Sequence, residues 1–142
     1  MMRLWAVFCV GLIVTGPLFS KTIDGVVVMK VLDQADAGEN LLKADDWRSW
    51  QAGFVRRGDV FVCDNGQDGQ VQRGASQTVT LNQIQPEPIV ATVQSKAEGV
   101  GGGRNSDYSL YLDLTYMDGT PLWGQVDMFD VGSGDWQTAK VV

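Results

Sequence analysis

The clearest pattern in the chain is a strict alternation of apolar and polar positions in its carboxy-terminal third. Between residues 108 and 116, every second side chain is large and apolar: Tyr108, Leu110, Leu112, Leu114 and Tyr116. The alternation resumes after a turn at 117–121 and continues to residue 128. Successive side chains of a strand point to opposite faces, so this period of two predicts two half-buried strands joined as a hairpin.

The alternation also predicts how the two strands pair. We expect Leu114 opposite Gly124 and Leu112 opposite Val126, which makes one face of the hairpin almost wholly apolar. The other face then carries two aromatic and three hydrogen-bonding side chains: Tyr111, Asp113, Trp123, Gln125 and Asp127. A slip of one residue would mix the two faces, so this register is expected to be well specified.

Shorter apolar or alternating runs, separated by turn residues, predict further strands. They cover residues 26–32, 59–63, 74–81 and 89–95, and a glycine-rich loop is expected at 99–105. No stretch has the period of a core helix. Many short strands with turn signals between them are typical of an all-β, antiparallel β-sandwich, which is the fold class we expect.

The amino-terminal segment follows a different pattern. Arg3 gives a positive start, and a nearly unbroken apolar run covers residues 4–14 before a Gly-Pro break. This order is typical of a secretory signal peptide, with cleavage near Ser20. The run is shorter than the roughly 20 residues that span a bilayer, although an uncleaved anchor stays the alternative. We therefore expect a signal peptide at 1–20, a mature domain at 21–142, and a secreted, periplasmic or cell-surface protein with no stable membrane span after signal removal.

Composition excludes several classes of function. A length of 142 residues is typical of one domain. The chain contains no histidine, so it has neither a Ser-His-Asp nor a Cys-His nucleophile system, nor a histidine-ligated zinc. Its formal net charge of -6 has the wrong sign for neutralising phosphates, and we expect no nucleic-acid partner.

Removal of the predicted signal would leave one cysteine, Cys63, in the mature domain. An exported protein meets an oxidising compartment, which favours disulfides. Two interpretations stay open. Either Cys63 is buried and inert, or its partner lies in sequence outside this chain.

The polar face of the predicted hairpin has the chemistry of a carbohydrate-binding surface. Sugars present CH faces that stack on flat rings and hydroxyls that need planar polar partners, and the face offers both. An ordinary solvated sheet face is one alternative, because strand propensity alone favours Tyr and Thr. A glycosidase acid–base pair of Asp113 and Asp127 is another, but any two acids on one hairpin face would fit that spacing. We assign no catalytic residue, and predict a glycan-binding protein that is not an enzyme.

An acidic stretch follows the first predicted strand of the mature domain. Its carboxylates could offer oxygen ligands to calcium: Asp33, Asp36, Glu39, Asp45 and Asp46. Their spacing does not match an EF-hand loop. The sequence therefore supports no cofactor, and a structural calcium ion stays an open alternative.

Several motifs together resemble a known family. They are Gly74-Ala75-Ser76-Gln77-Thr78-Val79-Thr80-Leu81, Ser106-Asp107-Tyr108-Ser109-Leu110-Tyr111-Leu112-Asp113, Asp118-Gly119-Thr120-Pro121-Leu122-Trp123-Gly124-Gln125 and Asp135-Trp136-Gln137. They are similar to the galactose-binding-like, jelly-roll carbohydrate-binding modules of secreted bacterial glycosidases, over roughly residues 47–142. The third motif is the most specific. The resemblance implies a jelly-roll sandwich that binds sugar.

The chain departs from that family in two respects. The Asn-x-x-Phe-Glu segment that helps such modules to bind a structural calcium is absent. The family also continues beyond Asp135-Trp136-Gln137 with further strands, where a second cysteine is often found. The resemblance therefore implies an incomplete module with an exposed sheet edge, unless the amino-terminal strand replaces part of the missing structure. A truncated structural or interaction domain without sugar binding is the corresponding alternative.

Overall fold

A computed structural model describes residues 2–10, 26–30, 39–66, 68–81, 83 and 88–142, with only the backbone described at 2–10 and 28–30. The described residues form ten strands and no helix: β1 (Met2–Val10), β2 (Val26–Lys30), β3 (Arg48–Gln51), β4 (Val55–Arg57), β5 (Val60–Asp64), β6 (Arg73–Leu81), β7 (Ala91–Glu98), β8 (Tyr108–Thr115), β9 (Pro121–Met128) and β10 (Gln137–Val141). No helix in this part of the chain is therefore long and apolar enough to cross a membrane.

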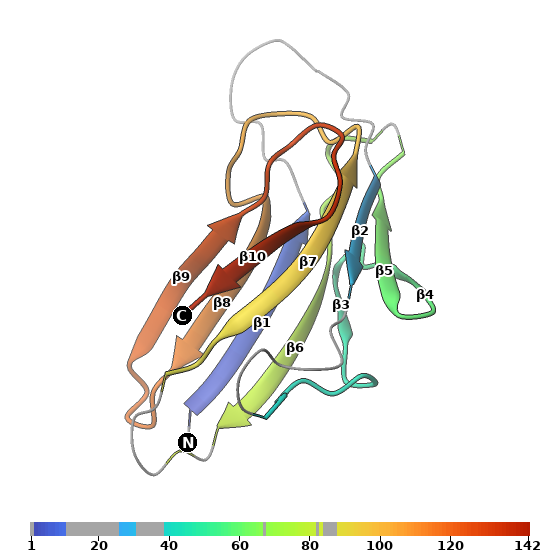
Figure 1. Cartoon of the computed structure of the whole chain (residues 1–142). Coiled ribbons are helices and arrows are strands. Elements are labelled where there is room, and N and C mark those ends of the chain that lie inside the picture. The colour runs from blue at the N-terminus through green and yellow to red at the C-terminus, as the bar shows by residue number, and fades with distance from the viewer. Residues whose placement is uncertain (1, 11–25, 31–38, 67, 82, 84–87) are drawn as a thin grey trace.

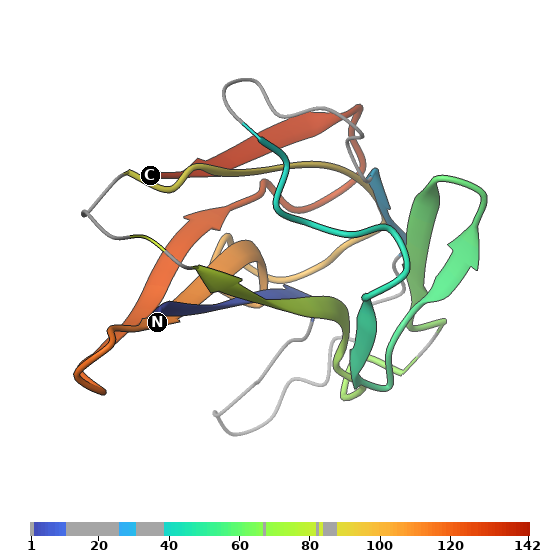
Figure 2. The same ribbon diagram turned by 90° about the horizontal axis from the view of Figure 1, so that it is seen from below.

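The strands form two five-stranded sheets that face each other. Sheet A has the order β3-β6-β1-β8-β9, and sheet B has the order β10-β7-β2-β5-β4. Every pair of neighbouring strands is antiparallel. Figure 2 shows the two layers, with β7 and β10 lying over β1, β8 and β9. The predicted all-β, antiparallel sandwich is confirmed.

The hydrophobic core lies between the two sheets and takes alternate residues from each. Its buried members from the two sheets are Ala75, Leu81, Tyr108, Leu110, Leu112 and Leu114 of sheet A, and Val27, Phe61, Cys63, Val93, Ala97 and Ala139 of sheet B. Two aromatic side chains that precede β5 pack on Phe61, with ring centroids 5.3 Å away for Trp47 and 4.3 Å away for Phe54. Because side chains alternate between faces, the neighbours of these residues in each strand point outward.

The predicted strands agree with the structure where the sequence pattern is long. β5, β6 and β8 lie where the sequence predicts them, while β7 begins two residues late and runs on to Glu98. The loop predicted at 99–105 joins β7 to β8. β3 and β4 were not predicted, because strands of four and three residues are too short to show a period of two.

The amino-terminal segment holds a central place in sheet A. Residues 2–10, part of the predicted signal peptide, form β1 between β6 and β8. Figure 1 shows this strand running through the middle of the sheet. Residues 11–20 of the predicted signal lie outside the described residues. Cleavage is a later processing event, so the division into 1–20 and 21–142 stays a prediction.

Cys63 is buried in β5, as one of the two interpretations of the sequence predicted. Its side chain is 1% exposed, and its thiol lies 3.7 Å from the carbonyl oxygen of Gly53. Burial raises the pKa of the Cys63 thiol to about 12, and the positive charge of Arg73 acts in the opposite direction. A thiol with so high a pKa carries almost no thiolate at neutral pH and is unreactive.

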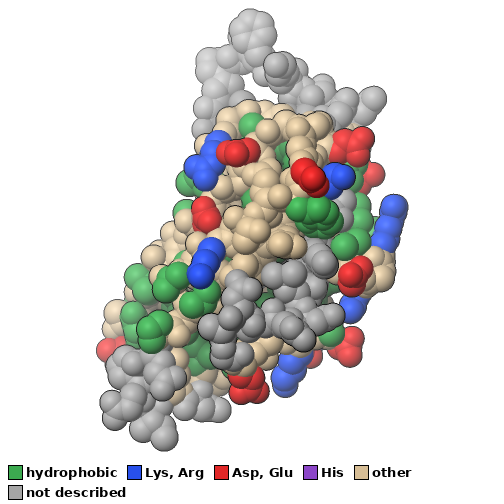
Figure 3. Space-filling model, viewed as in Figure 1, with side chains coloured by type: hydrophobic (Ala, Val, Ile, Leu, Met, Phe, Trp, Pro, Cys, Tyr) green, Lys and Arg blue, Asp and Glu red, His purple; other side chains and the backbone are tan. Residues whose placement is uncertain are grey.

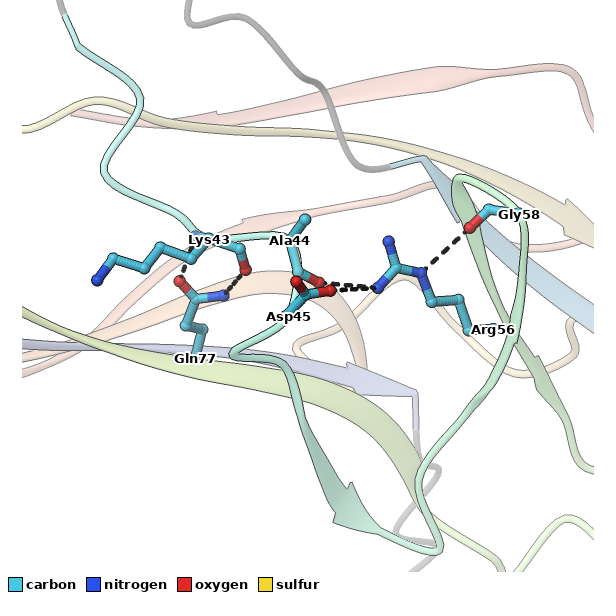
Figure 4. Close-up of polar contacts among 6 residues, drawn as sticks. All are labelled: Lys43, Ala44, Asp45, Arg56, Gly58 and Gln77. Atoms are coloured by element: carbon cyan, nitrogen blue, oxygen red, sulfur yellow. Dashed lines mark hydrogen bonds and ion pairs between the residues drawn. The ribbon is translucent and has the colours of Figure 1, made fainter.

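One loop segment connects the two sheets through polar contacts, which Figure 4 shows. On the side of sheet A, the amide of Gln77 in β6 accepts a bond from the backbone N–H of Lys43 at 2.7 Å and donates one to its carbonyl at 2.8 Å. On the side of sheet B, Arg56 of β4 donates to the carbonyl of Ala44 at 2.8 Å and lies 3.7 Å from the carboxylate of Asp45. We call residues 43–45 the bridging loop.

Candidate functional site

The candidate site lies on the β8–β9 hairpin, whose turn is held by backbone bonds. The N–H of Tyr116 donates to the carbonyl of Thr120 at 2.9 Å, and the N–H of Gly119 donates to the carbonyl of Tyr116 at 3.0 Å. The carboxylate of Asp118 accepts the N–H of Thr120 at 2.8 Å. Hydrogen bonds from the backbone and the side chain of Thr120 lower the pKa of Asp118. The turn therefore fixes where β9 begins.

The register that the sequence predicts for this hairpin is wrong. Next to the turn, Leu114 lies opposite Leu122 instead of Gly124. Farther along, Leu112 lies opposite Gln125 instead of Val126. The pairing shifts between Leu112 and Leu114, where β9 contains a β-bulge. A bulge adds a residue to one strand, so the alternation of one strand no longer matches that of the other.

Gly124 forms the bulge, and Asp113 stabilises it. Gly124 has a φ of 74°, a left-handed conformation that side chains other than glycine rarely adopt. Its N–H donates to a carboxylate oxygen of Asp113 at 2.9 Å. A Cβ atom at this position would lie 3.6 Å from the hydroxyl of Tyr111, so the glycine also leaves space beside that ring. The bulge thus brings Tyr111 and Asp113 together around one backbone position.

Three of the five predicted site residues share the outer face of sheet A. Tyr111 and Asp113 alternate with the buried leucines of β8, so they point away from the core. Leu122 lies opposite the inward-facing Leu114, and the next residue, Trp123, therefore points outward. Its side chain is 68% exposed. We call Tyr111, Asp113 and Trp123 the outer-face cluster.

The other two predicted site residues lie on the inner side of the same hairpin. Gln125 pairs with Leu112 and Asp127 pairs with Leu110, both of which point into the core. The carboxylate of Asp127 accepts the backbone N–H of Lys140 in β10 at 2.8 Å, so it joins the edges of the two sheets. The prediction that all five residues share one face is therefore wrong, because it rested on the unbulged register.

The same geometry bears on the glycosidase alternative. That alternative expected Asp113 and Asp127 on one face, close enough to act as acid and base. The bulge places them on opposite sides of the sheet, and each carboxylate accepts a backbone N–H. The two groups do not form the pair that this alternative needed.

Sequence reasoning missed the apolar surface beside the cluster. Three side chains at the end of the hairpin are exposed: Tyr116, Met117 and Leu122. In Figure 3, hydrophobic side chains gather over β9 and the end of β10. The predicted register assigned Tyr116 and Leu122 to the buried face. A pattern of alternation cannot show that a strand lies at the edge of a sheet, where both faces of the hairpin meet solvent.

The acidic stretch gives no support to the calcium alternative. The described part of the chain contains no group of three or more Asp, Glu, Cys or His side chains that could hold a metal ion. Asp33 and Asp36 lie outside that part, while Asp45 contacts Arg56 in the bridging loop.

Comparisons with known proteins add no relative. No family model matches the chain, and no curated protein or solved structure matches it either.

Proposed function

We propose that this protein is a non-catalytic glycan-binding module that acts outside the cytoplasm. The observation that carries the proposal is the exposure of Trp123 on the same outer sheet face as Asp113 and Tyr111. An indole ring left in solvent among hydrogen-bonding groups is a feature that binding surfaces share. The signal-like amino terminus supports export.

Each member of the outer-face cluster has a distinct role in this proposal. Trp123 stacks its ring on the CH face of a pyranose. One oxygen of Asp113 accepts the N–H of Gly124, and a carboxylate can accept further bonds from sugar hydroxyls. Tyr111, which is half-buried, supports the other side of the bulge. The bulge fixes the backbone that carries these side chains before a ligand arrives, and its bond to Asp113 holds that carboxylate in place, which limits the entropy lost on binding.

The proposed contact surface is smaller than the one that the sequence predicts. Asp127 already accepts a bond from Lys140 of β10, and Gln125 donates to the carbonyl of Trp123 at 3.1 Å. Both side chains therefore stabilise the hairpin that carries the cluster. Their replacement should affect binding only through the position of β9.

Replacement of Trp123 by alanine tests the proposal. Retention of the full chain on immobilised polysaccharides should weaken by about 1–3 kcal/mol, or roughly 5–150-fold, the range found for aromatic stacking platforms. Trp136 provides the matched control, since it is 42% exposed but lies between β9 and β10, away from the cluster. Trp136→Ala should leave retention unchanged. Equal retention of both variants on every glycan that binds the parent would contradict the proposal.

A second candidate function is an interaction domain that binds another protein. The exposed apolar side chains at the end of the hairpin, Tyr116, Met117 and Leu122, favour it. The two candidates differ in what they predict on a glycan array. The interaction domain gives no hit on the array, whereas the glycan-binding module gives hits that depend on Trp123.

A further inference from the structure

Sheet A is continuous only because a strand from the amino terminus lies in its middle. β1 pairs with β6 on one side and with β8 on the other, along most of its nine residues. Both neighbours are antiparallel to β1, so they run parallel to each other with one strand between them. Without β1, sheet A divides into β3–β6 and β8–β9, and each part has an unpaired edge.

The gap between β6 and β8 has a mostly apolar inner row and a polar outer row. The inner row has buried apolar side chains at Ala75, Leu81, Leu110, Leu112 and Leu114. It also has one buried polar side chain, Gln77, whose amide is bonded to the backbone of Lys43. Its outer row is polar or aromatic: Ser76, Thr78, Thr80, Tyr111, Asp113 and Thr115. An occupant must therefore supply backbone groups to both edges and apolar side chains at every second position.

Residues 2–10 meet these requirements by their register. The positions opposite the inner row carry apolar residues: Met2, Leu4, Ala6, Phe8 and Val10. Ala6, for example, lies between Gln77 of β6 and Leu112 of β8. The next residue, Val7, lies between Ser76 and Tyr111 of the outer row.

We propose that the gap between β6 and β8 is a strand-acceptor site. Once residues 1–20 are removed, as the sequence predicts, this site binds an extended partner segment of about nine residues that pairs antiparallel with both edges. The partner carries apolar side chains at alternate positions and no charge among them. Binding is favoured because it buries the side chains of the inner row and pairs both exposed strand edges. An unpaired edge of this kind otherwise favours aggregation.

The test uses the full chain, folded before it is cut. A specific protease site is inserted after Ser20, the intact protein is purified, and the backbone is then cleaved. A fluorescent peptide of residues 2–10 should replace the cleaved segment, and an excess of the unlabelled peptide should reverse that exchange. Mass spectrometry under native conditions counts the peptides bound to each protein.

Two peptide variants give the test its specificity. Asp at position 6 would place a charge against the inner row. The Ala6→Asp peptide should therefore need at least about a tenfold higher concentration than the parent peptide to displace the fluorescent peptide. Asp at position 7 would lie in the outer row, so Val7→Asp should compete within about threefold of the parent peptide. The same order of effects is expected whatever glycan the protein binds.

Two results would overturn the proposal. One is equal competition by the Ala6→Asp and Val7→Asp peptides, which would show that the rows of the gap do not select the occupant. The other is a cleaved protein that releases residues 1–20, binds no peptide, and shows full hydrogen-exchange protection along β6 and β8. In that case the two strands have closed the gap by themselves.

Discussion

The two sheets of the sandwich each have a central strand from the amino-terminal part of the chain, but the two strands differ in origin. β2, in the middle of sheet B, lies within the predicted mature domain. β1, in the middle of sheet A, lies within the predicted signal peptide. All five strands of sheet B thus come from residues 26–142, whereas sheet A also needs residues 2–10.

This difference indicates which sheet keeps all of its strands when residues 1–20 are removed. Val27 of β2 lies between Cys63 and Ala97, and all three side chains are buried. The leucines of β8 in sheet A pack against that layer, so sheet B can serve as the base on which sheet A assembles. Substitutions in sheet B should therefore have larger effects than substitutions at the edge of sheet A.

The largest effect is expected at the centre of sheet B. Val27→Asp places a charge at a position that is 0% exposed, with no partner among its buried neighbours. Such a change should lower the free energy of unfolding by about 4 kcal/mol or more, which is a large fraction of the stability of a typical domain. Chemical denaturation followed by tryptophan fluorescence measures it.

The matched control for that substitution is Lys96→Asp in β7. Lys96 is exposed and pairs with the neighbouring residue of β2, Val28. It should change the free energy of unfolding by no more than about 0.5 kcal/mol. Similar losses for both variants would show that sheet B is not the base of the fold.

A more gradual effect should follow the ionisation of Cys63, next to Val27 in sheet B. The pKa of its thiol is about 12 in the folded protein against 9.0 for a free thiol, so the unfolded chain loses this proton first. The free energy of unfolding contributed by Cys63 is constant below pH 9. It should fall by up to about 1.4 kcal/mol per pH unit between pH 9 and 12.

Comparison with Cys63→Ala isolates this contribution from other groups that titrate at high pH. Urea denaturation at several pH values should give a shallower decline for the variant than for the parent chain. Parallel declines would mean that the thiol is accessible to water in the folded state, and rapid reaction with a thiol reagent at pH 8 would then be expected as well.

The smallest effect is expected at the edge of sheet A. Gly124→Ala forces a Cβ into the left-handed region and should cost about 1–2 kcal/mol of stability. Because the bulge positions Trp123, glycan retention should fall as well. Gly134→Ala is the control, since Gly134 has open space around it and no left-handed φ. If both variants kept full stability and retention, the bulge would not determine the geometry of the cluster.

The sequence predicted the fold well where alternation was long and uninterrupted. The leucines of β8 identified both a strand and its buried face, and burial of Cys63 was one of the two interpretations that the sequence left open. The role of residues 2–10 in sheet A could not be predicted. A continuous apolar run fits a signal peptide, and it also fits a central strand with one face on the core, which needs apolar residues only at every second position.

The candidate site was predicted only in part, and the reason is one glycine. Gly124 shifts the pairing of β9 against β8, so Trp123 keeps its place on the outer face while Gln125 and Asp127 move to the inner one. In the register predicted from the sequence, the glycine was an ordinary paired position opposite Leu114. Its φ, and with it the bulge, depends on the Asp113 contact across the hairpin, which no local pattern contains.

The bridging loop has a consequence for which sequences this fold can tolerate. Lys43 and Ala44 contribute only backbone groups to the contacts with Gln77 and Arg56. Almost any residue can therefore stand at position 43, except proline, which lacks the N–H that Gln77 accepts. Position 77 tolerates far less, because a planar amide of this length is needed to accept and donate at once. Among variants that keep this connection between the sheets, positions 43 and 44 should diversify freely while the glutamine of β6 stays the same.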